Sequence, residues 1–480
     1  MKSEVIIILK NALKKLKIPL RDEEIEKFIE VPKDSEMGDY AFPCFFLAQK
    51  LKEDPKDIAI KIREIIGEIP NSFEDIQTIG AYINFFVNRK ELFLNTINEV
   101  LSKKENYGRN SSGNNQKIVV EFSSPNIAKP FGIGHLRSTI IGNSIANICE
   151  FNGYKIIRLN YFGDWGAQFG KLLFGFKKFG NKAKLKKDPV KNLLEIYVKA
   201  NNKMYESKAR EEFKKLEEGD KRTLELWKKF KKLSLNEFEK IYKILGIKFD
   251  EVLGESMYNS DMKNVLKALK DGKLLQQSEG ALIVDLTKFN LGVCLIEKTD
   301  GTTLYATRDL ASAISRYNRF KFSKMIYEVG QEQILYLKQV FKILELMGYD
   351  WAKNCIHVDH GFYLDKDGKK FATRKGKTVF MEDVLKETIS LAEKEIKKRF
   401  PKLSKGELQR RANKVAIAAI FYGDLKNNRI NNMIFDIDRF VSFEGDTGPY
   451  LLYSYARASS ILEKAKKQKL KKSEFEDFEE

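Results

Sequence analysis

Residues 117–170 constrain the fold of this 480-residue chain more than any other stretch. The stretch opens with a β-branched run at residues 118–120, which is too short for a helix and apolar enough for a strand buried on both faces. A polar turn follows, and a helical pattern then places apolar residues on one face at Leu136, Ile140, Ile145 and Ile148. Gly153 is placed to end that helix, and residues 155–159 indicate the next strand. Such a βαβ unit predicts an α/β fold built on a parallel sheet.

The turn between this strand and this helix has the composition of a phosphate-binding site. Gly132 and Gly134 let a nucleotide approach the main chain, and the N–H groups at a helix start attract anions. Lys129 and His135 add side-chain donors for phosphate oxygens. Glycine also serves ordinary tight turns, so the spacing alone leaves open a packed βαβ crossover that binds no ligand.

Longer sequence motifs in the same stretch help to decide between a phosphate-binding site and a crossover that binds no ligand. EFSSPNIAKPFGIGHLRST at residues 121–139, followed by NYFGDWGAQFG at residues 160–170, resembles the arginyl-tRNA synthetases, a branch of the class I aminoacyl-tRNA synthetases. Class I enzymes carry HIGH at this helix start and hold ATP there, whereas this chain reads GIGH, with Gly132 in place of the first histidine. The resemblance implies ATP-dependent attachment of L-arginine to tRNA(Arg) through an arginyl-adenylate. It also implies a set of ATP contacts at this turn: Lys129, Gly132, Gly134 and His135.

A second sequence motif, TLYATRDLA at residues 303–311, resembles the arginine-pocket helix of the same family. Because a guanidinium is planar and permanently charged, its pocket needs a carboxylate that accepts two parallel N–H bonds. We expect Glu121 and Asp309 in that role, with Tyr305 as a wall and hydrogen-bond partner. Without the resemblance, an aspartate in a first helical turn could simply be there because its negative charge interacts favourably with the helix dipole. The resemblance assigns the remaining contacts to the amino acid to Ser124, Asn126, His135 and Gln333.

A basic segment stands where class I enzymes usually carry KMSKS, a loop that steadies the triphosphate. It reads FATRKGK at residues 371–377, with Thr373 in the place of the second lysine. The resemblance implies that Lys129 compensates for that loss, and it predicts ATP contacts at Lys370, Arg374 and Lys375. As bare composition, the segment is equally typical of a solvated charged turn.

Composition bounds the partners and the compartment. Lys and Arg number 86 against 67 Asp and Glu, and the net charge of +19 fits an RNA partner, although a lysine excess also serves solubility. Four scattered cysteines in apolar contexts indicate reduced core residues, and three scattered histidines do not suggest a catalytic metal; Mg²⁺ is expected only with ATP. No apolar run approaches the length of a membrane span, so we expect a cytoplasmic protein without membrane contact, and a monomer.

The chain divides into four expected parts. Residues 1–102 predict an α+β N-terminal domain that resembles the family's tRNA-binding domain, and residues 103–116 form a Gly-, Ser- and Asn-rich linker. A Rossmann-like nucleotide-binding catalytic domain is expected at residues 117–404, with a largely helical insertion near 182–290. Residues 405–480 resemble a helical stem and the start of an anticodon-binding domain, incomplete at this length.

Several local predictions follow from periodicity and turn residues. A strand is expected at residues 79–87 and another at 325–330. Hairpin-like strands are expected at residues 274–286 and 293–298, with a turn signal at Asp300 and Gly301, and a further hairpin at residues 357–370. The aromatic residues of segment 38–51 fit either a tRNA surface or plain core packing: Tyr40, Phe42, Phe45 and Phe46. Trp165 fits either the pocket wall or the edge of the core.

Two other functions stay open at this point. Related folds form adenylates of other acids at a similar turn, which would make the chain a different nucleotidyl transferase. A non-catalytic RNA-binding relative is the second alternative, suggested by Gly132 in place of the first motif histidine. The joint presence of Glu121, Tyr305 and Asp309 favours a cationic amino acid.

Overall fold

The computed structural model describes residues 1–127, 131–298, 305–369 and 380–468. The chain divides into two compact units at the peptide between Arg109 and Asn110, and each unit is described by itself.

The first unit packs helices against a small antiparallel sheet. Its helices are α1 (Lys2–Lys15), α2 (Asp22–Phe28), α3 (Phe45–Leu51), α4 (Pro55–Ile66) and α5 (Arg89–Lys103). Its strands, in the order β1-β3-β2, are β1 (Tyr40–Pro43), β2 (Phe73–Ile79) and β3 (Tyr82–Val87). The strand expected at residues 79–87 is confirmed over Tyr82–Val87 as β3, but its start is wrong, because Gly80, with φ +60°, turns the chain and Ile79 ends the antiparallel neighbour β2.

The aromatic residues of segment 38–51 do not share one environment. Phe42 is fully buried in the core of the first unit, and Phe46 stacks on Phe28 with ring centroids 3.8 Å apart. Tyr40 is partly buried against the same core, whereas Phe45 is 53% exposed. Core packing therefore accounts for Phe42 and Phe46, and Phe45 alone of the four faces solvent broadly.

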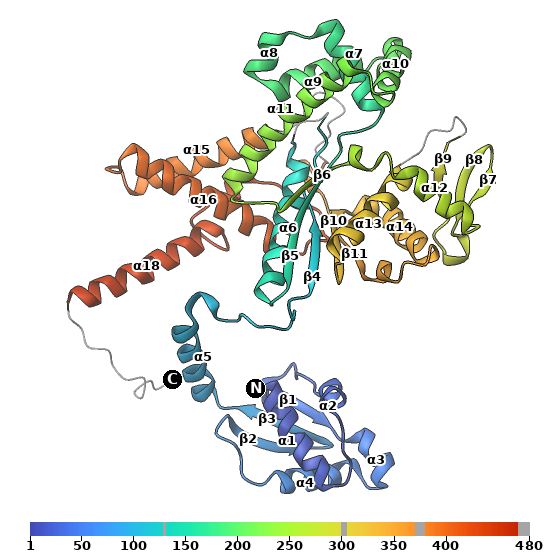
Figure 1. The fold of residues 1–480 in the computed structure, drawn as a ribbon. Coiled ribbons are helices and arrows are strands. Elements are labelled where there is room, and N and C mark those ends of the chain that lie inside the picture. Colours follow the sequence, from blue (N-terminus) through green and yellow to red (C-terminus); the bar gives the residue numbers. More distant parts are fainter. Residues whose placement is uncertain (128–130, 299–304, 370–379, 469–480) are drawn as a thin grey trace. The chain divides into compact units, whose positions relative to one another are not determined.

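The second unit is organised around a five-stranded parallel sheet, in the order β11-β10-β4-β5-β6 (Figure 1). Its strands are β4 (Lys117–Glu121), β5 (Lys155–Phe162), β6 (Glu251–Gly254), β10 (Lys324–Gly330) and β11 (Cys355–His360). The chain runs from β4 outward to β5 and β6, then returns to β10 on the other side of β4. That reversal is the topological switch point at which α/β sheets bind ligands. The predicted α/β, Rossmann-like class is confirmed.

The central strand β4 is buried on both of its faces. Ile118 and Val120 pack into one hydrophobic core, while Val119 between them packs into another. Helix α6 (Ile133–Phe151) covers the first face, as the βαβ pattern predicts. The apolar stripe of α6 fades along its length: Leu136 and Ile140 are fully buried, Ile145 is partly buried and Ile148 is 59% exposed.

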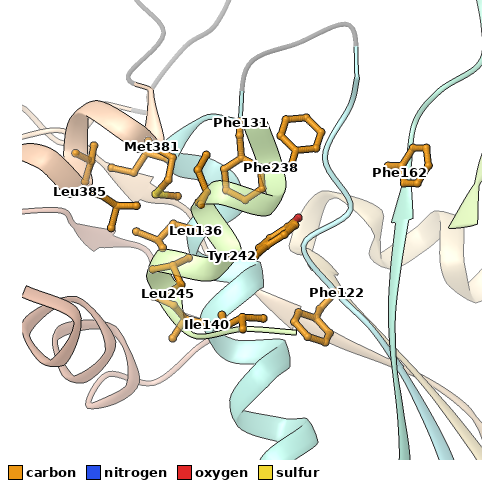
Figure 2. Close-up of a cluster of buried hydrophobic side chains, with 14 of the residues drawn as sticks. Phe122, Phe131, Leu136, Ile140, Phe162, Phe238, Tyr242, Leu245, Met381 and Leu385 are labelled. Carbon is orange, nitrogen blue, oxygen red and sulfur yellow. The ribbon is translucent and has the colours of Figure 1, made fainter. Parts of the chain in front are cut away.

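Figure 2 shows what holds the start of α6 in place. Leu136 and Ile140 of α6 lie among Phe238 and Tyr242 of α11 (Lys221–Leu245) and Met381 of α15 (Met381–Arg399). Helices far apart in sequence therefore share one apolar cluster with the turn that follows β4.

The helical insertion is present between β5 and β6. It comprises α7 (Ala167–Phe179), α8 (Lys182–Lys187), α9 (Pro189–Ala200), α10 (Glu206–Glu217) and α11, which gather at one end of the sheet in Figure 1. A second group follows β6: α12 (Met262–Asp271), the antiparallel strands β7 (Gln276–Ser278), β8 (Ala281–Asp285) and β9 (Val293–Glu297), α13 (Tyr305–Phe320) and α14 (Ile334–Leu346). The strands predicted at residues 274–286 and 293–298 are confirmed as the antiparallel pair β8 and β9, but a turn at Glu279 and Gly280 separates β7 from β8 within the first of them; the expected turn signal at Asp300 and Gly301 lies outside the described residues.

The C-terminal part is mostly helical. Beside α15 it contains α16 (Lys405–Leu425), α17 (Ile437–Val441) and α18 (Gly448–Lys467), with two short strands, β12 (Tyr363–Leu364) and β13 (Met433–Ile434). The hairpin predicted at residues 357–370 is wrong, because β11 pairs in parallel with β10, and β12 pairs in parallel with β13. No helix of the described residues is long and apolar enough to cross a membrane.

Two further expectations concern single residues. Cys44, Cys294 and Cys355 are buried and Cys149 is partly buried, and all four are free thiols, as predicted. Trp165 belongs to the core, where its ring centroid lies 5.7 Å from that of Trp227, so the core-edge interpretation of this tryptophan holds.

Candidate functional site

A cavity of about 510 Å³ opens at the carboxyl ends of β4, β5 and β10, where the strand order reverses. Its wall takes residues from the turn after β4, the start of α6, the end of β5, helix α13 and the segment after β10. The fold thus brings together segments that are separated by more than 200 positions, from Glu121 to Gln333. Both lie on the wall of this cavity.

The turn after β4 is held in an uncommon backbone conformation. Ser123 and Ser124 have φ of +72° and +39°, a region that side-chain-bearing residues rarely occupy. Ser138 of α6 holds the turn by accepting the N–H of Ser123 at 2.9 Å. Asn126 approaches Gly163 so closely that a Cβ there would stand 2.1 Å from its Oδ1. Ser124, Asn126 and Gly163 all line the cavity as a result.

The start of α6 forms one end of the cavity. His135 accepts the N–H of Gly132 at its Nδ1, 3.2 Å away, so the proton of the neutral ring is on Nε2. Gly134 is exposed on the wall, and no described atom lies within 4 Å of the position its Cβ would take. The N–H of Met381 donates to Phe131 O at 3.0 Å and ties this turn to α15. The result is a pinned helix start with an open backbone face, the geometry that favours an anion.

The other end of the cavity is acidic. Glu121 ends β4, Asp309 lies one turn into α13 and not in its first turn as expected, and both line the cavity. Tyr336 of α14 donates its hydroxyl to Asp309 Oδ2. Burial raises the pKa of Asp309, which the Tyr336 hydrogen bond and the Arg316 charge oppose.

Glu121 differs from Asp309 because it already has a cationic partner. Arg316, two helical turns beyond Asp309 on α13, donates Nη1 to Glu121 Oε2, and both side chains are buried. The Arg316 guanidinium also lies over the ring of Tyr161, 4.3 Å from its centroid. Burial raises the pKa of Glu121, and Arg316 lowers it. Glu121 therefore faces the cavity as half of an ion pair, and not as the lone carboxylate expected from sequence.

A third carboxylate, Glu255, lines the acidic end and was missed by the sequence analysis. It follows β6 directly, and its Oε2 is buried without a hydrogen-bond partner among the described residues, 3.9 Å from Arg308 Nη1. Burial, followed by the negative charge of Asp309, raises the pKa of Glu255 to about 8. The available signal was its position at the carboxyl end of a sheet strand.

The remaining predicted residues divide into three groups. Gln333 lies on the cavity wall, where the short turn after β10 places it. Tyr305, the first residue of α13, is 63% exposed and is not among the cavity-lining residues, so the structure does not bring it together with Asp309. Four predicted ATP contacts lie outside the described residues: Lys129, Lys370, Arg374 and Lys375. Tyr161 and Tyr336 line the acidic end that Tyr305 was expected to wall.

Comparison with known proteins gives this arrangement a class. Residues 96–437 match the family model described as tRNA synthetases class I (R), catalytic domain, and residues 3–87 match that of the arginyl tRNA synthetase N terminal domain. The fold and the site therefore define a class I aminoacyl-tRNA synthetase. They combine a parallel sheet with this strand order, a helix start and a cavity at the switch point of the sheet.

Individual relatives agree with that class. The chain is 46% identical over 458 residues to the arginine–tRNA ligase of Clostridium perfringens, covering 94% of this chain and 80% of the relative. It is 44% identical to arginine–tRNA ligase 2 of Bacillus anthracis, covering 93% and 79%. The crystal structure of arginyl-tRNA synthetase from Plasmodium falciparum superposes with a TM-score of 0.77 at 27% identity, covering 96% of this chain and 81% of that one. The chain belongs to the arginyl-tRNA synthetase family.

Proposed function

We propose that this cavity is where the protein attaches L-arginine to tRNA(Arg) in two ATP-dependent steps. The observation that carries the proposal is the chemistry of the cavity wall, which combines a pinned helix start with the carboxylates of Glu121, Glu255 and Asp309, in addition to that of Glu332. An anionic triphosphate fits the helix start and a cationic side chain fits the acidic end. A single elongated site thus joins the two substrates of adenylate formation.

The acidic end binds the guanidinium of arginine, and its charge count explains why. Arg316 neutralises Glu121, and Arg308 Nη1 lies 3.9 Å from Glu255 Oε2, so once arginine binding has ionised Glu255, Asp309 and Glu255 together carry about one negative charge in excess of these two cations. A planar cation with several N–H donors matches two carboxylates better than an ammonium does. Glu121 then contributes its second oxygen and its fixed orientation. The amino and carboxylate end of arginine lies against Ser124, Asn126, His135 and Gln333.

In the first step the arginine carboxylate attacks the α-phosphate of ATP, and pyrophosphate leaves. In the second, a 2′-hydroxyl of the terminal adenosine of tRNA takes the arginyl group, and AMP leaves. Both steps require alignment and neutralisation of charge but no protein nucleophile. Gly132, Gly134 and His135 hold the phosphates from the helix start. Lys129, Lys370, Arg374 and Lys375 supply further positive charge to the triphosphate from segments outside the described residues.

Mg²⁺ enters this site bound to ATP. The described residues contain no group of three or more His, Cys, Asp or Glu side chains placed to hold a metal. Magnesium commonly binds through substrate phosphates and water with few protein ligands. A wall without a metal-binding group among the described residues therefore fits an ion that arrives bound to the nucleotide. The ion would neutralise charge on the phosphates.

The remaining parts of the chain serve tRNA. We assign tRNA binding to residues 1–102, which the linker at 103–116 joins to the catalytic residues 117–404, and to the C-terminal residues 405–480. A net charge of +19 supports a polyanionic partner. We further propose that the protein works as a monomer in the cytoplasm.

The decisive experiment is pyrophosphate exchange into ATP with each of the twenty amino acids, with and without tRNA(Arg). The proposal expects exchange with arginine alone, and tRNA is included because related enzymes commonly need it for activation. Exchange with another acid would identify a different nucleotidyl transferase. Failure with every amino acid, while tRNA still binds, would identify a non-catalytic RNA-binding relative.

A further inference from the structure

Arg137 occupies an unexpected place in α6. It stands two residues after His135, yet it is 1% exposed and points away from the cavity, which is lined by its neighbours His135 and Ser138. A buried guanidinium is unfavourable unless other groups compensate its charge and its donors. The proposed chemistry does not use Arg137, so its burial requires another explanation.

The compensating groups come from three other segments. Arg137 Nε lies 3.5 Å from Oδ1 of Asp424 on α16, which is also 1% exposed. Arg137 Nη1 donates to Asn431 O at 2.7 Å, and its guanidinium carbon lies 5.6 Å from the ring centroid of Tyr363 in β12. Tyr363 donates its hydroxyl to Asp424 Oδ2. One buried polar cluster, formed by Arg137, Tyr363 and Asp424, thus joins α6, β12 and α16.

This polar cluster is poorly suited to stabilising the fold. Arg137 Nη2 has no hydrogen-bond partner among the described residues, and Nε meets Asp424 only at the long distance of 3.5 Å, so the donors of the guanidinium are incompletely satisfied. Burial raises the pKa of Asp424, against the opposing influence of Tyr363 and Arg137. Replacement of a buried ion pair by apolar side chains is often neutral or stabilising. The polar groups therefore serve something other than stability, such as a defined geometry.

The geometry in question is that of the first turn of α6, which is held from two sides. On the cavity side, Ser138 accepts the N–H of Ser123 at 2.9 Å and donates to Glu328 O at 3.1 Å. On the opposite side Arg137 reaches Asp424 and β12. The segment before β12 returns to the cavity, because His360 and Phe362 lie on its wall.

We infer that Arg137 is a positioning residue, whose contacts with Asp424 and Tyr363 fix the first turn of α6 so that His135 and the helix-start N–H groups are aligned with ATP. The inference rests on the proposed function and adds to it a structural link between the ATP end of the cavity and α16. Misalignment by about 1 Å can reduce a rate by about a hundredfold. Arginine binding at the opposite, acidic end does not depend on this cluster.

The test replaces the whole cluster by apolar side chains of similar size, in the variant Arg137→Met/Tyr363→Phe/Asp424→Leu. We expect its Tm to match or exceed that of the wild type, because no charge remains buried without a partner. In pyrophosphate exchange with tRNA present, kcat/KM for ATP should fall by about a hundredfold while KM for arginine stays within about twofold. A stable variant that exchanges at the wild-type rate overturns the inference.

Two further variants keep the test decisive. If the triple variant is unstable, Arg137→Lys replaces it in the test. Lysine keeps the positive charge but cannot reproduce the guanidinium contacts with Asp424 and Asn431, so kcat/KM for ATP should fall. An unchanged kcat/KM for ATP overturns the inference. The matched control is Glu150→Gln/Arg158→Met, which removes the 2.7 Å ion pair at the last turn of the same helix. Its ATP kinetics should equal the wild type, and an equal loss there would contradict a role specific to the first turn.

Failure of the proposed function has a separate signature. A wild-type protein that shows no arginine-dependent exchange contradicts the function before any variant is examined. Calorimetric titration with Mg·ATP then replaces the rate as the readout. The inference expects weaker ATP binding by the triple variant than by the wild type and the control, and equal Kd values overturn it.

Discussion

The two ends of the cavity achieve recognition by different physical means. At the helix start, Gly134 and His135 lie on the cavity wall and the N–H of Gly132 is held by His135 Nδ1, so this end depends on local backbone geometry. At the acidic end, Glu121, Glu255 and Asp309 come from three distant elements, and each charge is adjusted by a neighbour. Backbone recognition should therefore tolerate the loss of a side chain, whereas carboxylate recognition should not.

The largest expected effect is that of Asp309→Ala. Loss of this carboxylate removes one of the two carboxylates that pair with the substrate guanidinium in a buried site, which weakens arginine binding by about 5 kcal/mol, or several thousandfold. Pyrophosphate exchange with arginine should be abolished at ordinary concentrations, while the Kd for ATP, measured by calorimetry, should not change. Asp285→Ala is the matched control, because Asp285 lies on β8 and is not on the cavity wall. Unchanged arginine-dependent exchange by Asp309→Ala would refute the assignment of the pocket.

The second prediction separates charge compensation from substrate binding. Arg316→Met leaves Glu121 buried without its cation, and we expect the free energy of unfolding at pH 7 to fall by about 3–5 kcal/mol. Denaturant unfolding measures the change. Glu121→Gln/Arg316→Met should recover most of that stability, since no isolated charge remains. If the single variant is as stable as the wild type, Glu121 does not need Arg316 and the charge count at the acidic end is wrong.

The third prediction uses the pH dependence of Glu255. In the empty cavity its pKa is about 8, so at pH 7 the carboxyl is mostly protonated, and binding of a cation must displace that proton. KM for arginine should consequently decrease as pH rises from about 6.5 to 8.5 and level off above the pKa. Glu255→Gln should raise KM for arginine by about tenfold above pH 8 and remove the dependence. A variant that keeps the same pH profile would assign it to another group.

Sequence reasoning recovered the elements that depend on local patterns. Strand β4, the start of α6 and strand β5 follow from apolar periodicity and glycine placement, whereas Ser124 and Asn126, which line the cavity after β4, were assigned by the family resemblance. Asp309 was identified because the sequence motif that contains it resembles a motif of a known family. These features lie within short windows of the chain.

The missed features depend on packing between distant segments. Nothing near Glu121 in the sequence shows that Arg316, 195 positions away, takes one of its oxygens. Arg316 could have been suspected, since it lies seven residues after Asp309 and so on the same helix face. Tyr305 is a different case, because its neighbours in sequence suggested a pocket wall, whereas it is exposed in the structure and the tyrosines that line the cavity near Asp309 are Tyr161 and Tyr336.

The smallest expected effect is at the helix start, where Lys129→Ala tests whether the backbone carries most of the phosphate recognition. If main-chain N–H groups and His135 hold the triphosphate, one lysine adds about 1 kcal/mol, so the rate of adenylate formation should fall by only about fivefold. The fold and KM for arginine should not change, and single-turnover measurement of adenylate formation with tRNA present gives the rate. A wild-type rate would show that Lys129 does not compensate for the altered basic loop. A loss as large as that of Asp309→Ala would show that side-chain charge, and not backbone geometry, dominates both ends of the cavity.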